Sequence, residues 1–235
     1  MLSKKNQHLR EIEMHNMIDL AFPVKGTALD ADHNYFLYSA ICQEFPALHD
    51  LPNLAINTIS GMPDRQGKIL LTPHSKLWMR LPVENISHIY QLAGKKLRIG
   101  KYSVELGNPT LQSLQPVDSL KARIVTIKGY TEPIPFLEAV KRQLSALEIK
   151  DGELGIPANH QGIPKRLTLK IKKPNKTYSI VGYSVLLTNL SPEDSLKLQC
   201  SGLGGKRRLG CGVFYPAVKI STEKGGNRHD ETIAG

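Results

Sequence analysis

The order of amphipathic segments along the chain is the feature that most constrains its fold. Five segments of the first half have the alternating or apolar pattern of extended chain: 17–24, 54–59, 68–72, 77–81 and 96–106. Apolar residues at helical spacing predict a helix that ends at Pro46 and a second helix over 83–93. Asp30 or Asp32 is expected to cap the first helix.

The second half repeats this order. Its predicted strands lie at 121–128, 166–171, 178–187 and 211–220, with a turn over 173–176. Helices are predicted over 133–147 and from Ser191, a good N-cap followed by Pro192, to Gly202. Two successive β-α-β-β-α-β passages predict an α+β protein with two tandem ferredoxin-like (RRM-like) domains and antiparallel sheets.

The same pattern suggests where the domains begin and end. We expect a first domain over 17–107, a linker over 108–118 and a second domain over 119–220 that contains the glycine-rich segment. Residues 1–16 are expected to form a flexible extension, and the glycine-rich, charged residues 221–235 a disordered tail.

The positive charge of the chain is concentrated in its second half. The formal net charge is +10, and residues 118–220 contain 17 Lys and Arg against 8 Asp and Glu. This asymmetry indicates a polyanionic partner, most commonly nucleic acid, although a basic surface kept for solubility is the alternative. Without a long apolar run or a signal-peptide core, we expect a cytoplasmic protein with no membrane partner.

The cysteines do not indicate a disulfide framework or a zinc site. There are three, Cys42, Cys200 and Cys211, and none belongs to a C-x-x-C pair. We expect reduced and buried thiols, no metal site and no cofactor.

The most distinctive segment runs from Gly202 to Phe214 and is called the glycine loop below. It contains five glycines and three consecutive cations: Gly202, Gly204, Gly205, Lys206, Arg207, Arg208, Gly210 and Gly212. Glycines allow tight turns that present backbone amides to phosphates, and the cations add charge. The segment lacks the spacing of a nucleotide P-loop, and it follows a helix and opens a strand, the reverse of a dinucleotide-binding motif.

A second cationic feature lies in the predicted strand at 166–171 and its flanks. Leu167, Leu169 and Ile171 would face inward, which leaves the polar side chains in a row on the other face. The candidate RNA-binding residues of this row and its flank are Lys165, Arg166, Lys170 and Lys172. The alternative is a solvated edge strand whose lysines prevent aggregation.

The glycine loop, placed after the last helix of a second ferredoxin-like domain, resembles that of the CRISPR-associated RAMP superfamily. Residues 32–41 are similar to the first helix of the repeat-RNA endoribonucleases of that superfamily, and 75–81, 92–97 and 122–128 also match. The resemblance covers about Met17 to Ala217 and looks closest to the Myxococcus-type and cyanobacterial variant.

This resemblance implies a metal-independent endoribonuclease that cleaves precursor CRISPR RNA within each repeat. The ribose 2′-OH would attack the adjacent phosphate, leaving a 2′,3′-cyclic phosphate and a 5′-OH. The implied partner is CRISPR repeat RNA. Retention on the mature guide RNA, beside other subunits of an effector complex, is an open alternative to release.

The resemblance also suggests catalytic residues. His49 occupies the place of the family's usual general acid or base after the first helix, although it could instead cap that helix or pack in a loop. His33 is a rival, and Tyr38 could support the transition state or belong to the core. The supporting cation is not assigned, and the nearest candidates in sequence are Arg65, Lys68 and Lys76.

Two other functions remain open at this point. One is a non-catalytic RAMP-type subunit that only binds guide RNA, because degenerate enzymes retain their folds and loops. The other is a general RNA-binding protein, which would leave the glycine loop unexplained.

Overall fold

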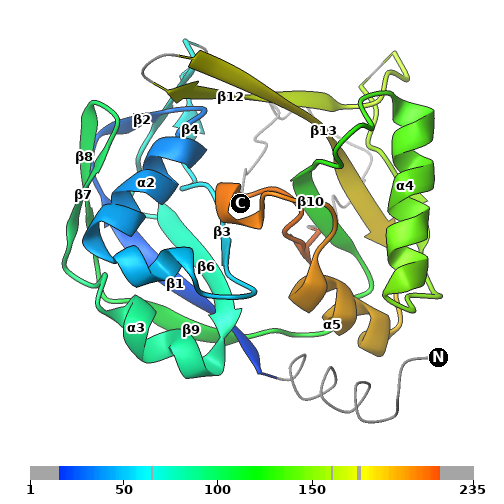
Figure 1. Ribbon diagram of the computed structural model, residues 1–235, viewed down its shortest axis with the longest axis horizontal. Helices are drawn as coiled ribbons and strands as arrows, with labels where there is room; N and C mark the ends of the chain where they lie inside the picture. The colour runs from blue at the N-terminus through cyan, green and yellow to red at the C-terminus, as the bar shows by residue number, and fades with distance from the viewer. Residues whose placement is uncertain (1–15, 65, 160, 174–175, 218–235) are drawn as a thin grey trace, which may run out of the picture.

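The two halves of the chain form two sheets that lie side by side (Figure 1). The computed structural model describes residues 16–64, 66–159, 161–173 and 176–217 of the 235-residue chain. Residues 1–15 of the expected N-terminal extension and the whole expected tail, 221–235, lie outside the described residues. No described helix is long and apolar enough to cross a lipid bilayer.

The sheet of the first half has the strand order β3-β6-β1-β8-β7. Its strands are β1 (Met17–Lys25), β3 (Ala55–Ile56), β6 (Lys76–Pro82), β7 (Lys96–Ile99) and β8 (Tyr102–Leu106). A small separate sheet contains β2 (Ala28–Asp30), β4 (Met62–Pro63) and β5 (Lys68–Leu70). The helical segments are α2 (Asn34–Glu44), η1 (Pro46–His49), η2 (Val83–Asn85) and α3 (Ile86–Tyr90).

The sheet of the second half has the order β11-β13-β10-β14. Its strands are β10 (Leu120–Val125), β11 (Glu153–Gly155), β13 (Lys176–Thr188) and β14 (Tyr215–Pro216), with β12 (Arg166–Lys173) paired to β13. Its helical segments are α4 (Pro133–Ala146), α5 (Pro192–Ser201) and η3 (Arg207–Leu209). All these pairings are antiparallel.

This topology confirms the predicted α+β fold with two tandem ferredoxin-like domains. In the first half β1 lies between β6 and β8, and β3 pairs with β6; in the second half β10 lies between β13 and β14, and β12 pairs with β13. The hairpin β12–β13 reaches from the second half toward α2 of the first half, across the top of Figure 1. Ser191 caps α5 as predicted, because its hydroxyl accepts a hydrogen bond from the Asp194 amide.

Three predicted elements differ from the structure. The expected linker over 108–118 contains a strand, β9 (Thr110–Ser113), which pairs with β1. The expected helix over 83–93 is divided into η2 and the short α3. Of the expected strand over 211–220 only β14 is extended, because Gly212 has a φ of +68° that interrupts strand geometry; residues 218–220 lie outside the described part.

The expected aspartate cap of the first helix is also wrong, because His33 is the N-cap of α2 and no side chain caps it. The His33 ring is 2% exposed. Its Nε2 accepts a hydrogen bond from the Ile59 amide at 3.0 Å, so Nδ1 carries the proton and donates to the Asp30 carbonyl at 2.8 Å. Burial lowers the pKa of His33 to about 4, so the ring is neutral at neutral pH.

Each half has its own apolar core, and a buried guanidinium joins them. Arg80 on β6 is 4% exposed and binds both carboxylate oxygens of Asp19, with Nε 2.7 Å from Oδ1 and Nη2 2.8 Å from Oδ2. Its Nη1 donates to the carbonyls of Gln199 and Phe214 in the second half, both at 2.8 Å. One side chain therefore connects the first sheet to α5 and to the end of the glycine loop.

We predict that Arg80→Ala lowers the free energy of unfolding by about 3–5 kcal/mol, because it leaves the Asp19 carboxylate without its buried counter-ion. Urea denaturation followed by circular dichroism measures this. Arg98→Ala is the matched control, since Arg98 is an exposed arginine on β7 and should change the free energy by less than about 0.5 kcal/mol. Equal effects of the two substitutions would contradict the connecting role of Arg80.

His33 should make the protein sensitive to acid. An unfolded histidine binds a proton near pH 6.5, whereas folded His33 binds one only near pH 4, so the unfolded state gains protons first as the pH falls. Between these values the free energy of unfolding should fall by up to about 3 kcal/mol from this group alone. Urea titrations at pH 7 and pH 4.5 should show a smaller fall in His33→Gln; an identical fall in both proteins would refute the assignment.

Candidate active site

The chain that follows α2 brings His49 against Tyr38. Pro46 ends the helix and starts η1, whose Leu48 is buried and whose last residue, His49, is exposed. The Tyr38 hydroxyl lies 2.7 Å from His49 Nδ1, and the two rings meet edge to face at 5.9 Å between centroids. Two of the three predicted catalytic residues therefore form a hydrogen-bonded pair. The third, His33, is buried with both ring nitrogens bonded, which argues against the predicted catalytic role.

Tyr38 lies in a partly buried position on α2. Burial raises the pKa of its hydroxyl, contact with the Cys42 thiol adds to the increase, and the nearby Arg208 guanidinium partly opposes it. The phenol is therefore protonated at neutral pH and can donate a hydrogen bond to His49 Nδ1.

The glycine loop crosses from the second half to this pair. Arg208 Nη1 donates to the His49 carbonyl and Nη2 to the Leu51 carbonyl, each at 2.6 Å. Asn34 at the start of α2 donates from Nδ2 to the Leu209 carbonyl, also at 2.6 Å. These three hydrogen bonds fix η3 against the segment that contains His49.

The expectation that the glycine amides of the loop face phosphates is wrong. All five donate within the protein: Gly202 to the Leu198 carbonyl, Gly204 to Gln143 Oε1, Gly205 to the Thr126 carbonyl, Gly210 to the Arg207 carbonyl and Gly212 to the Ile124 carbonyl. Their function is steric. A Cβ on Gly212 would lie 1.9 Å from the Leu203 carbonyl oxygen, and a Cβ on Gly202 would lie 2.2 Å from the Gly212 carbonyl oxygen. Only glycine therefore allows the two ends of the loop to pack so closely.

The three cations of the loop point in different directions. Lys206 is exposed and Arg208 binds the two carbonyls described above. Arg207 points inward, where Nη1 donates to the Ser201 carbonyl at 2.7 Å and its buried Nε and Nη2 have no hydrogen-bond partner. Burial, with a contribution from Arg80, lowers the pKa of Arg207 to about 10. Of the predicted triplet, Lys206 is thus the residue best placed to contact a phosphate.

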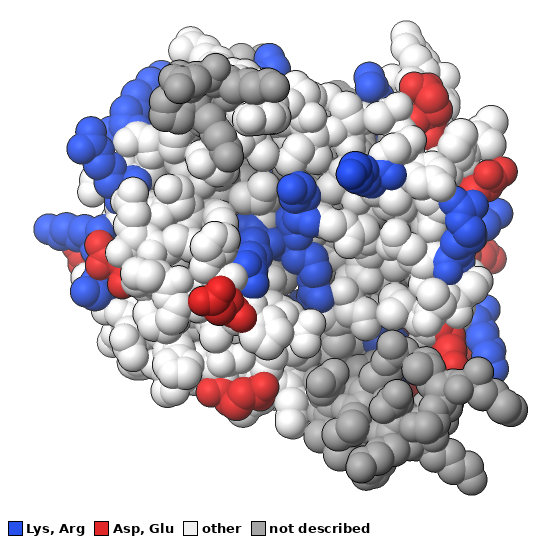
Figure 2. Space-filling model, viewed as in Figure 1, with Lys and Arg blue, Asp and Glu red and all other residues white. Residues whose placement is uncertain are grey.

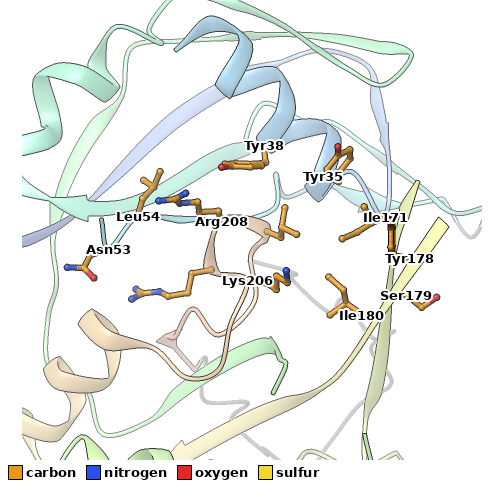
Figure 3. Close-up of a pocket in the computed structure, with 12 residues that line it drawn as sticks. Tyr35, Tyr38, Asn53, Leu54, Ile171, Tyr178, Ser179, Ile180, Lys206 and Arg208 are labelled. Atoms are coloured by element: carbon orange, nitrogen blue, oxygen red, sulfur yellow. The ribbon is translucent and has the colours of Figure 1, made fainter. Parts of the chain in front are cut away.

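A cleft of about 830 Å³ lies between α2, the β12–β13 hairpin and η3. Its walls include Tyr35 and Tyr38 from α2, Tyr178 from the hairpin, and Lys206 and Arg208 from η3 (Figure 3). Figure 2 shows Lys and Arg side chains gathered in the middle of the same face of the molecule. Because Tyr38 also binds His49, the cleft opens directly beside the hydrogen-bonded pair.

The predicted cationic strand has the expected alternation. Leu169 is buried and Leu167 and Ile171 are half-buried, whereas the intervening side chains of β12 and its flank are exposed: Lys165, Arg166, Thr168 and Lys170. Lys172 belongs to β12, but its side chain lies outside the described residues. The Lys170 amide donates to Asp32 Oδ2 at 3.3 Å, which attaches this strand to the start of α2.

Two of the cations that we proposed from sequence proximity, Lys68 and Lys76, do not line the cleft. Lys68 is in β5, and the ammonium of Lys76 lies 5.8 Å from the centre of the Trp78 ring; Arg65 lies outside the described residues. Tyr35 and Tyr178 line the cleft but were not among the site residues predicted from the sequence. A signal was present for Tyr35, because its i, i+3 spacing to Tyr38 places both on one helix face.

The remaining titratable groups show no metal-binding arrangement. Among the described residues, no three His, Cys, Asp or Glu side chains are grouped to hold a metal ion. All three cysteines are thiols and not disulfide partners; Cys200 and Cys211 are buried and Cys42 is half-buried. Burial raises the pKa of Cys200 to about 11 and that of Cys211 to about 12.

Comparison with known proteins gives a consistent result. A sequence model described as Cas6 Crispr matches residues 18–219. The chain is 33% identical over 199 residues to the CRISPR-associated endonuclease Cas6 of Myxococcus xanthus, an alignment that covers 85% of this chain and 81% of that protein.

Solved structures share the fold. One described as a CRISPR associated protein Cas6 has a TM-score of 0.55 at 12% identity, covering 86% of this chain and 98% of its own. A Cas6-related protein from Pyrococcus furiosus has a TM-score of 0.54 at 17% identity, with the same coverage. The family match over most of the sequence, the tandem ferredoxin-like fold and the glycine loop together show that this chain belongs to the Cas6 family of CRISPR-associated proteins.

Proposed function

We propose that this chain is a metal-independent endoribonuclease that cleaves CRISPR repeat RNA at the Tyr38–His49 pair. The observation that carries this proposal is the 2.7 Å hydrogen bond between Tyr38 and His49 at the edge of a cleft bordered by Lys206 and Arg208. The Myxococcus relative is named an endonuclease, and its similarity extends over both domains. A structural neighbour of the same fold, with a TM-score of 0.52, is described as a RAMP protein binding different RNA substrates.

In this reaction the ribose 2′ oxygen attacks the adjacent phosphorus and the bond to the 5′ oxygen breaks. The products are a 2′,3′-cyclic phosphate and a 5′-OH, so the 2′-OH loses its proton to a base, here water, and the leaving 5′ oxygen gains a proton from an acid. In its protonated form the His49 ring carries a proton on each nitrogen, so Nδ1–H donates to the Tyr38 oxygen and Nε2–H remains available to the substrate. We therefore assign His49 Nε2 as the general acid that protonates the leaving oxygen.

The RNA is expected to follow the cations on this face. Lys206 is exposed and lines the cleft, so it is suited to a phosphate near the scissile bond. Arg166 and Lys170 on the outer face of β12 supply further phosphate contacts to a repeat stem. His33 is buried and Arg207 is half-buried with its guanidinium donating to the Ser201 carbonyl, so both are assigned structural roles in this proposal.

The first test is cleavage of the protein's own repeat RNA in EDTA. Wild type should cleave an all-ribose substrate and leave a substrate with a 2′-deoxy scissile nucleotide intact. His49→Ala should lower the rate constant about 10²- to 10⁴-fold, the usual contribution of a general acid. His74→Ala is the control, since His74 is exposed and outside the cleft. If wild type binds the RNA without cleaving it, the protein is a non-catalytic subunit. If it cleaves RNA of any sequence equally well, it is a general nuclease.

A sulfur leaving group separates an acid from a base. A 5′-bridging phosphorothiolate expels a thiolate, which leaves without protonation. The rate defect of His49→Ala should therefore shrink to a few-fold on this substrate, measured in the same single-turnover assay. A defect of equal size on both substrates would contradict the assignment and would make His49 the base.

Arg208 is assigned as a positioning residue for His49. Its guanidinium donates to the His49 and Leu51 carbonyls, and a lysine ammonium cannot reproduce this bidentate contact. Arg208→Lys should lower kcat about 10- to 100-fold with KM within about twofold, because small displacements of a reacting group are costly.

Lys206→Gln is the matched control in the same loop. It removes an exposed charge without disturbing His49, so it should raise KM several-fold and leave kcat nearly unchanged. If the two variants changed kcat and KM in the same way, Arg208 would be a phosphate contact, as the sequence first suggested.

A further inference from the structure

The apolar face of the β12–β13 hairpin continues beyond the core that it covers. Leu169 pairs with Ile180, and Ile171 pairs with Tyr178, so these four side chains lie on one face. At the inner end, Leu169 is 4% exposed and packs with Ile124 and Cys211. At the outer end, Tyr178 is 44% exposed beside the cleft. The outer end thus presents an aromatic surface to the cleft.

The opposite wall is also aromatic. Tyr35 and Tyr38 are three residues apart on α2, so they lie on one face with their Cβ atoms ~5–6 Å apart. Figure 3 shows Tyr35 at the side of the cleft nearer the hairpin and Tyr38 at the side of Arg208. Lys206 lies between the walls. The cleft therefore combines aromatic rings from both halves of the protein with a cation.

The two walls are held at a set separation. The Lys170 amide donates to Asp32 Oδ2 next to the start of α2, and Asn34 on the same helix binds the Leu209 carbonyl. The hairpin, α2 and η3 are thereby connected to one another around the cleft. The space is preformed, which favours a flat ligand over one that must open the site.

We propose that this cleft is a nucleobase pocket, in which an unpaired base next to the scissile phosphate stacks on Tyr178 and Tyr35. The proposal rests on the assignment of the Tyr38–His49 pair as the cleavage site, because Tyr38 belongs to both. A nucleotide presents a flat π-face for the tyrosines and an adjacent phosphate for Lys206. Bases inside a stem are already stacked on their neighbours, so the pocket selects RNAs with an unpaired nucleotide at the cleavage site.

The test uses repeat RNA with 2-aminopurine at each of the two nucleotides that flank the scissile phosphate, made uncleavable by a 2′-deoxy scissile nucleotide. At one of the two positions, wild type should quench the fluorescence by stacking. Tyr178→Ala should abolish the quenching and weaken binding about tenfold, within the range of base–aromatic stacking. Tyr178→Phe retains the ring and should behave as wild type.

An abasic site at the quenched position completes the comparison. Removing the base should weaken RNA binding by wild type about tenfold. It should weaken RNA binding by Tyr178→Ala hardly at all, because the tyrosine ring and the base contribute through the same contact. Tyr90→Ala is the matched control, since Tyr90 on α3 is 45% exposed and away from the cleft. Absence of quenching at both positions, or equal losses for Tyr178→Ala on intact and abasic RNA, would overturn the proposal.

This readout does not depend on cleavage. If wild type fails to cut RNA but quenches through Tyr178, the base pocket stands and the nuclease assignment fails. If wild type cuts RNA and shows no quenching, the nuclease assignment stands and the pocket fails.

Discussion

The contact between Arg208 and the carbonyls of His49 and Leu51 is the interaction on which the candidate site depends. It joins the glycine loop of the second half to the segment after α2 in the first half, at 2.6 Å for each hydrogen bond. Without it, the imidazole would be held only through η1 and the Tyr38 hydroxyl. The proposed acid is therefore positioned by a residue more than 150 positions away in the chain, so both domains are needed to form the site.

A second constraint lies beneath this contact. Arg80 and Arg207 place two guanidinium groups in the buried junction, where their mutual repulsion is opposed by Asp19 and by three backbone carbonyls. Buried charges are costly unless they are paired, and Arg207 is paired only in part, because its Nε and Nη2 have no hydrogen-bond partner. The glycine loop follows a crowded path, in which Gly202 and Gly212 leave no space for a Cβ.

The basic triplet, which the sequence assigned to phosphate binding, has more than one task in the structure. Arg207 and Arg208 stabilise the junction and orient His49, and Lys206 alone of the three is exposed. In the proposed function, phosphate binding is assigned to Lys206 and to the outer face of β12. The aromatic cleft between them adds a surface that can recognise a base, which cations alone cannot do.

The sequence by itself determined the tandem ferredoxin-like fold, the hairpin, the cap of α5 and His49 and Tyr38 as candidates. These depend on local periodicity, turn residues and one family resemblance, all of which are present along the chain. It could not determine which cations face solvent, where the glycine amides donate, that Tyr178 and Tyr35 line one cleft, or that His33 is buried. Those outcomes depend on contacts between residues from different halves, and only the packing of the two domains brings such residues together.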